Sequence, residues 1–160
     1  MRKIDDALKS NECSVMKNPD RAHAKVLIMK LLENAREEVI IFCHRLARDV
    51  YGSEEVCDAL IKAYQNHPSL NVKVYIRDDA PDFSPFVSIL LNKGVRIQCG
   101  VNTEHESIGN VILTDGESGY ITLHENTFDG QVYFNDVEKI RRIRGKLLNL
   151  FDKNKETKYE

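Results

Sequence analysis

Three short apolar runs, separated by segments of helical length, constrain the fold of this chain more than any other feature. Residues 38–43 form a continuous apolar run of the kind that a strand buried on both faces produces. Residues 72–76 and 95–99 repeat the pattern. Strands that alternate with helices predict right-handed crossovers and a largely parallel sheet. This part of the chain therefore indicates an α/β fold.

Helix signals surround these runs. Glu54 and Glu55 are acidic residues suited to a first helical turn, Pro85 suits the first position of a helix, and Gly94 is a typical helix end. Apolar residues recur at helical spacing within each segment. We expect helices near residues 19–35, 54–67, 85–94 and 137–152.

The pattern then changes, because the later apolar runs follow one another without helices between them. Residues 110–126 have the pattern of a hairpin, in which Asp115-Gly116 is the strongest short turn signal of the chain. These strands should add antiparallel members to the sheet. The prediction is one α/β domain with a mixed central sheet, helices on both faces, and strands near residues 38–44, 71–77, 95–99, 110–115, 119–124 and 131–134.

Length and composition fit this single domain. At 160 residues the chain can bury about two thirds of its unfolded surface around one core. Hydrophobic residues make up 42% and charged residues 30%, which argues against disorder. The formal net charge of −2 argues against a positive electrostatic potential over the whole molecule of the kind that attracts nucleic acid. We expect an N-terminal arm or a short edge element over residues 1–18, the domain over 19–152 and a charged tail over 153–160.

The sequence also predicts a cytoplasmic protein without membrane association. No apolar run approaches the length of a membrane span, and the first residues lack the apolar core of a secretion signal. Cys13, Cys43, Cys57 and Cys99 show neither CxxC spacing nor nearby histidine pairing. We therefore expect free thiols.

The order of these elements resembles that of a known protein family. The phrase Val-Lys-Val-Tyr-Ile-Arg-Asp at residues 72–78 is followed by a short helix ending in Asn-Lys-Gly-Val at 92–95, then a strand, a hairpin turning at Asp115-Gly116, a strand and a final helix. Over residues 21–152 this order resembles the phospholipase D superfamily, particularly its small single-motif nucleases. The resemblance implies a phospholipase D-like domain without a cofactor, which forms a homodimer with two motifs facing each other across a two-fold axis.

The chemistry of that family resides in a motif of the form His-x-Lys-x4-Asp. The resemblance implies that the histidine is the nucleophile and that the lysine neutralises the phosphate. When the aspartate is aligned with Asp115, Ile108 occupies the histidine position and Asn110 the lysine position. Isoleucine cannot form a phosphoryl intermediate, and asparagine supplies no positive charge. The family's following Ser-x-Asn pair falls at His124 and Asn126 if the turn is one residue longer.

Other histidines could replace the missing nucleophile. His105 lies three residues before Ile108, and His124 lies on the second strand of the hairpin. As a pair they could act as nucleophile and general acid. The simpler interpretation places both in solvated loops or at strand ends.

Polar residues also follow two of the predicted parallel strands. Catalytic and binding residues of an α/β domain commonly lie at such strand ends. His44 and Arg45 follow the first strand, and Asp78 and Asp79 follow the second. These four residues are the candidate cleft. The aspartates, and the acidic residues around His105, make an oxygen-rich Mg²⁺ or Mn²⁺ site conceivable. No ligand spacing is diagnostic and the resembled family needs no metal, so we expect none.

The final helix carries a basic face. Such a patch suits a nucleic acid or an acidic protein partner, although most basic helix faces are simply solvated. Glu138 is the single acidic residue in the same span as Lys139, Arg141, Arg142, Arg144 and Lys146.

Two functional classes remain open. The first is a catalytically degenerate binding or regulatory module, and the second is a phosphodiesterase or nuclease that uses a displaced histidine, His105 or His124. The missing histidine and lysine favour the first. We also expect a homodimer joined through the hairpin side, with Ile108 and His124 near the axis.

Overall fold

The computed structural model describes residues 14–18, 21–43, 53–76, 86–101, 111–122, 130–153 and 156–159. Within these ranges the chain forms four helices and one mixed sheet of eight strands. In chain order the elements are β1 (Ser14–Asn18), α2 (Arg21–Glu33), β2 (Glu38–Cys43), α4 (Glu54–Asn66), β3 (Asn71–Ile76), α5 (Phe86–Asn92), β4 (Ile97–Val101), β5 (Val111–Thr114), β6 (Ser118–Thr122), β7 (Gly130–Phe134), α6 (Val137–Lys153) and β8 (Glu156–Tyr159).

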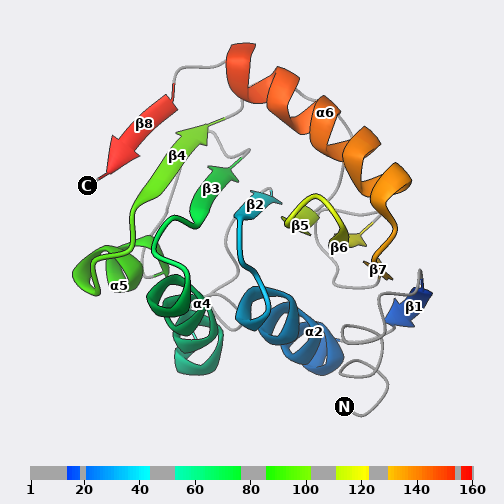
Figure 1. The fold of residues 1–160 in the computed structure, drawn as a ribbon, viewed down its shortest axis with the longest axis horizontal. Helices are drawn as coiled ribbons and strands as arrows, with labels where there is room; N and C mark the ends of the chain where they lie inside the picture. Colours follow the sequence, from blue (N-terminus) through cyan, green and yellow to red (C-terminus); the bar gives the residue numbers. More distant parts are fainter. Residues whose placement is uncertain are drawn as a thin grey trace.

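Parallel and antiparallel strands share this sheet (Figure 1). The strand order is β1-β7-β6-β5-β2-β3-β4-β8. β2, β3 and β4 pair in parallel, and every other pairing is antiparallel. α4 and α5 lie in the two connections between the parallel strands, as a parallel crossover requires. Because β5 pairs with β2, both halves of the chain build one sheet.

Helices cover both faces of the sheet, as predicted. α2, α4 and α5 lie on one face, and α6 lies on the other (Figure 1). Val39 and Ile41 of β2 join the core on the side of α2, α4 and α5, whereas Ile40 and Phe42 pack on the α6 side. All four side chains are fully buried. This burial on both faces explains why the strand has a continuous apolar run.

The six predicted strands are confirmed to within two residues, and the four predicted helices are present. β4 shows the largest shift, since it begins at Ile97 rather than at residue 95. Gly94 ends α5 with a φ of 82°, a left-handed value that favours glycine. The Val95 N–H then donates to the Leu90 carbonyl at 3.1 Å. Val95 therefore completes the helix cap, and the strand starts later.

The predicted arm and tail contribute the two edge strands. β1 pairs with β7, and β8 pairs with β4, both in antiparallel register. The expectation of a charged tail over residues 153–160 is thus corrected, because Glu156–Tyr159 is part of the sheet. An unpaired strand edge presents a row of backbone donors and acceptors, which even a short polar segment can satisfy.

The predicted hairpin turn is confirmed in its geometry. Asp115 and Gly116 have φ values of 57° and 65°, the positive pair that a type I′ turn requires. The Glu117 N–H donates to the Thr114 carbonyl at 3.1 Å and closes the turn. Asp115-Gly116 therefore sets the register of β5 against β6.

The prediction of free thiols is confirmed for Cys57 and Cys99, which are buried. Burial raises the pKa of the Cys57 thiol to about 11 and that of Cys99 to about 12, so both stay protonated at neutral pH. The side chains of Cys13 and Cys43 lie outside the description. In the part of the chain that the structure describes, no helix has the length and apolar character needed to cross a membrane.

Candidate functional site

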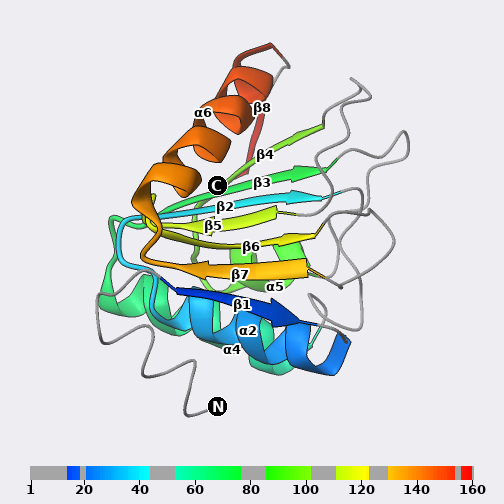
Figure 2. The ribbon, with the colours of Figure 1, turned by 90° about the vertical axis from the view of Figure 1, so that its right-hand side faces the viewer.

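The six central strands of the sheet each have one end at the same edge, which we call the motif edge. β2, β3 and β4 end there, β5 and β7 begin there, and β6 ends there. Figure 2 shows these strands side by side. Carboxyl ends of parallel strands commonly carry the chemistry of an α/β domain. The strand ends are Cys43, Ile76, Val101, Val111, Thr122 and Gly130.

The predicted cleft and motif residues attach to this edge in the sequence but lie outside the described residues. His44 directly follows Cys43, and Asn110 directly precedes Val111. The register, which sets Phe42 opposite Val111, places both attachment points at the motif edge. Their mutual geometry stays a prediction. The residues outside the description are His44, Arg45, Asp78, Asp79, His105, Ile108, Asn110, His124 and Asn126.

A buried aromatic layer lies behind the motif edge on the α6 side of the sheet. The rings of Phe42 and Tyr75 stack with centroids 5.9 Å apart and an interplanar angle of 23°. Tyr75 lies opposite Gly100 on β4. A Cβ atom at Gly100 would come within 2.7 Å of Tyr75 Cδ2, so only glycine leaves room for this ring. The layer holds the ends of β2, β3 and β4 together.

Asp115 is the one aligned motif residue that the structure describes, and it lies at the opposite edge of the sheet, which we call the turn edge. Its Oδ1 accepts hydrogen bonds from the backbone N–H groups of Arg36, Glu37 and Glu38 at 3.1, 2.7 and 3.0 Å. Its Oδ2 accepts from the Arg36 N–H at 3.0 Å. The carboxylate therefore ties the hairpin turn to the start of β2. Val111, at the other end of β5, is four residues away, roughly 13 Å along the strand, so Asp115 acts at the turn edge as a structural tie.

A polar groove lies at the turn edge between α6 and the hairpin turn. Its cavity volume is about 450 Å³, and Glu37, Glu117 and Arg141 are among its lining residues. In this groove Arg144 forms a two-point contact with Glu38, with Nε 2.6 Å from Oε1 and Nη2 3.0 Å from Oε2. These hydrogen bonds raise the pKa of Arg144 above its ordinary value. The contact ties α6 to β2.

Two long-range contacts of Glu38 were not predicted from the sequence. Its backbone N–H binds Asp115, and its carboxylate binds Arg144, 106 residues away. An acidic residue at the start of an apolar run is the single hint in the sequence, because a buried strand seldom begins with a charge unless that charge has a partner.

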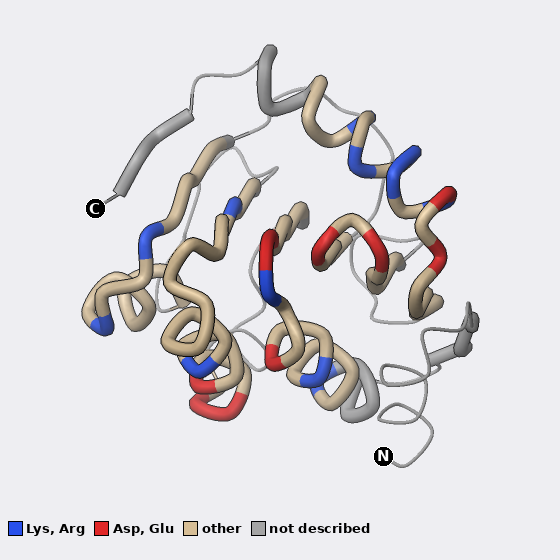
Figure 3. The backbone as a smooth tube through the Cα atoms, in the orientation of Figure 1, with Lys and Arg blue, Asp and Glu red and all other residues tan. Residues whose placement is uncertain are grey.

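The predicted basic residues lie on α6, apart from the motif edge. α6 begins at Val137, close to the turn edge, where β7 ends. Figure 3 shows lysine and arginine positions along this helix. Arg144 still contacts Glu38 at the turn edge. The basic helix and the motif edge are therefore separate surfaces.

Within the described residues, no group of three or more His, Cys, Asp or Glu side chains could hold a metal ion. The aspartates that raised the metal alternative, Asp78 and Asp79, lie outside these residues. The expectation of a metal-free site therefore stays a prediction.

No protein-family model and no curated protein matches the sequence. Solved structures do match the fold. Nuc from Salmonella typhimurium, a phospholipase D family member, superposes with a TM-score of 0.68 at 14% identity and covers 92% of this chain and 100% of its own. NucT from Helicobacter pylori gives 0.56 at 14% identity, covering 89% of this chain and 97% of its own.

A third similar structure is TrmBL2, described as an archaeal chromatin protein with a novel mode of DNA binding. It superposes with a TM-score of 0.61 at 12% identity. The match covers 91% of this chain and 53% of TrmBL2. At such identities the three likenesses establish a shared fold and leave the activity of this chain open.

Proposed function

Because this chain has the phospholipase D superfamily fold, we propose that it is a catalytically degenerate member that acts as a binding or regulatory module. One observation carries the proposal. With the motif aligned on Asp115, Ile108 stands where the family has its nucleophilic histidine, and Asn110 stands where it has the lysine. The module would hold its ligand or partner without cleaving it.

The position of Asp115 supports this alignment. It follows β5 directly, at the turn of the hairpin, and β5 pairs with the central strand β2. The four hydrogen bonds that Asp115 accepts from the start of β2 fix the register of the hairpin against that strand. A register slip of one residue would turn every side chain of β5 to the other face of the sheet.

The chemistry of the two substitutions supports loss of catalysis. Isoleucine has no lone pair to attack phosphorus, and asparagine offers hydrogen bonds without the charge that stabilises a developing oxyanion. Removal of a nucleophile from an enzyme costs on the order of 10⁶ in kcat. A protein lacking both groups should therefore turn over at the background rate.

We propose a class of ligand for this module from the proteins with similar structures. TrmBL2 is described by its DNA binding, and the part of it that matches this chain makes up 53% of its length, which supports a nucleic acid as a candidate ligand. A nucleic acid or a protein partner therefore suits the module. The buried free thiols of Cys57 and Cys99 support the reducing, cytoplasmic location that we also propose.

We predict that the purified protein hydrolyses neither bis(p-nitrophenyl) phosphate nor DNA above the buffer rate. The reason is the absence of a nucleophile and a cation at Ile108 and Asn110. Release of nitrophenol and gel analysis of DNA, each with and without EDTA, measure this directly.

His105→Ala and His124→Ala serve as the matched variants for this assay. Activity that either variant abolishes, with the circular dichroism spectrum unchanged, would show that a displaced histidine replaces the nucleophile. Activity that survives both variants and co-purifies with the protein would also contradict the proposal, because it would require a nucleophile elsewhere in the chain. Ile108→His combined with Asn110→Lys is not expected to restore turnover by itself, because the surrounding side chains must also position the new groups.

We further propose that the protein is a homodimer joined through the motif edge, with Ile108 and His124 near the two-fold axis. An apolar residue at this position can be buried in a self-complementary contact, whereas a charged residue would remain hydrated. Light scattering at tens of micromolar should give twice the mass of the 18.4 kDa chain.

Ile108→Glu is expected to convert this dimer to a monomer, since it places two like charges near the axis. Val137→Glu is the matched control. Val137 is 37% exposed at the start of α6, at the turn edge, so this aliphatic-to-glutamate change should leave the dimer intact. A monomeric wild type, or a dimer that Ile108→Glu leaves unchanged, would contradict the proposed interface.

A further inference from the structure

The outer face of α6 carries most of its positive charge. Ile140, Ile143 and Leu147 turn toward the sheet and pack with the core on that side. The opposite surface is exposed over two helical turns. We define the outer face of α6 by its exposed residues Lys139, Arg141, Arg142, Gly145 and Lys146.

Internal contacts leave this charge largely uncommitted. Arg142 Nη2 is 3.7 Å from Glu138 Oε1, but the two side chains are 70% and 89% exposed, so the pair is weak. Within the described residues, Arg141 and Lys146 form no ion pair, and Arg141 lies where the outer face meets the polar groove that Glu37 and Glu117 also line. The structural role belongs instead to Arg144, which is bound to Glu38.

Lys139 stands at one end of this face. Its Nζ lies 4.6 Å from the centroid of the Tyr133 ring on β7. An ammonium over an aromatic face keeps its charge and remains able to donate hydrogen bonds outward. Lys139 is exposed, so its charge adds to that of Lys146 two turns later.

Gly145 is a glycine that the fold itself does not need. It lies inside α6, and its φ is not among the positive values. A Cβ atom there would meet nothing within 4 Å. Glycine inside a helix is less stable than alanine, so its presence at an exposed position without a steric reason is unexpected. Arg141 and Arg142 lie one turn before it, on the same surface.

We propose that the outer face of α6 binds the phosphate backbone of a nucleic acid, with Gly145 allowing a phosphate to approach between the neighbouring arginines. Arginine is suited to this role because its planar fork binds a phosphate at two points. From Lys139 to Lys146 the helix rises about 10.5 Å, enough to span about three phosphates of one strand. Among the described elements, α6 is the one helix on its side of the sheet, which leaves its outer face open to a long polymer (Figure 1).

The chemistry of the surface favours a nucleic acid over a membrane. Among the described residues, Val137 is the single exposed large hydrophobic side chain. A helix that binds a lipid surface needs an apolar face to insert into it, and the apolar face of α6 is turned toward the sheet. This surface is separate from the motif edge, so the inference holds whether or not the motif edge has lost catalysis.

The test measures binding of the full chain to a fluorescein-labelled DNA duplex by anisotropy over a range of salt concentrations. The variant combines Arg141→Gln, Arg142→Gln and Lys146→Gln. If three phosphate contacts are lost, the slope of the logarithm of the binding constant against the logarithm of the salt concentration should decrease in magnitude by about three. The matched control combines Lys25→Gln, Lys62→Gln and Lys93→Gln and should bind like wild type.

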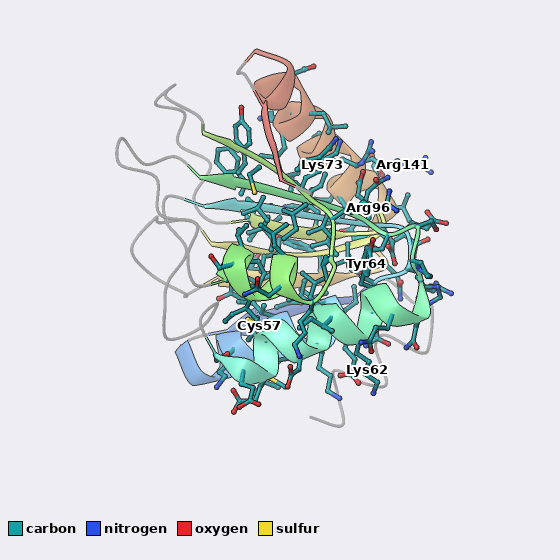
Figure 4. The ribbon with its side chains drawn as sticks, turned by 90° about the vertical axis from the view of Figure 1, so that its left-hand side faces the viewer. Cys57, Lys62, Tyr64, Lys73, Arg96 and Arg141 are labelled. Atoms are coloured by element: carbon teal, nitrogen blue, oxygen red, sulfur yellow. The ribbon has the colours of Figure 1, made fainter. Side chains whose placement is uncertain are left out.

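The control residues lie on the other side of the sheet. Lys25 and Lys62 belong to α2 and α4, and Lys93 directly follows α5. Figure 4 shows Arg141 beside α6 and Lys62 on the opposite side of the molecule. The control therefore removes the same charge from a different surface. Equal losses in both triple variants would overturn the proposal.

Gly145→Leu gives a second readout that charge alone does not explain. The open space around residue 145 accommodates the side chain, so the melting temperature should not fall. Binding should weaken by about tenfold, the equivalent of one lost hydrogen-bonded charge contact. Unchanged binding would overturn the role of Gly145. A wild type that binds acidic phosphatidylserine vesicles but no DNA or RNA duplex would overturn the proposed ligand.

Discussion

Replacing Asp115 with alanine is expected to lower the free energy of unfolding by about 3 kcal/mol. The backbone N–H groups of Arg36, Glu37 and Glu38 would lose a carboxylate acceptor that lies 2.7–3.1 Å away. Alanine would also occupy a φ of 57°, which disfavours a residue with a Cβ atom and no polar side chain. Urea unfolding followed by circular dichroism measures the change.

Asp115→Asn is the matched control for this prediction. Asparagine keeps an oxygen at the Oδ1 position, which accepts three of the four bonds, and it tolerates left-handed φ values. The expected loss is about 1 kcal/mol, because the charge and the Oδ2 bond disappear. Equal losses for alanine and asparagine would show that the hydrogen bonds contribute little and that the motif alignment lacks this structural anchor.

Gly100→Ala is expected to lower the free energy of unfolding by about 2 kcal/mol through overpacking. A Cβ atom would come within 2.7 Å of Tyr75 Cδ2, and the ring cannot swing away freely because it is fully buried and stacked on Phe42. The strain would fall on the aromatic layer behind the motif edge. Thermal or urea unfolding measures this effect.

Gly145→Ala makes the same substitution where the neighbourhood is open. No atom lies within 4 Å of a Cβ at this position, and alanine favours the helix. Stability should therefore rise, by up to about 1 kcal/mol. A loss of stability in Gly100→Ala together with a gain in Gly145→Ala would support the packing described at both positions. A destabilising Gly145→Ala would contradict the description of the outer face of α6.

The central elements of the fold were predictable because local and tertiary signals agree in them. The apolar run that begins at Glu38, the acidic first turn of α4 at Glu54 and Glu55, and the Asp115-Gly116 turn each mark an element that the structure contains. Burial on both faces gives β2 a signature that needs no knowledge of its neighbours.

The sequence offered a short edge element within residues 1–18 only as one alternative and gave no sign of the strand at residues 156–159, because the stability of both edge strands comes from their partners. β1 is a short, largely polar segment, and β8 reads Glu-Thr-Lys-Tyr. Neither has the apolar run that marks a buried strand. Each is held by backbone hydrogen bonds to an edge that exists only after β7 and β4 have formed.

The strand ends beside the candidate site were predictable, whereas most residues of the site itself lie outside the described part of the chain. The sequence placed the polar residues at strand ends, and the register brings those ends to one edge. It assigned Asp115 to the motif but gave no sign of its bonds to Arg36, because a contact 79 residues apart depends on the whole sheet. The same limit applies to the pair of Arg144 and Glu38.

Intact-protein mass spectrometry tests the proposed loss of catalysis most directly. A histidine nucleophile would form a bond to the phosphorus of bis(p-nitrophenyl) phosphate and displace one nitrophenolate, which leaves the protein heavier by a nitrophenyl phosphoryl group. We predict an unmodified mass at every time point, sampled without acid. A mass increase that His105→Ala or His124→Ala removes would contradict the account, because it would identify a working nucleophile in place of Ile108.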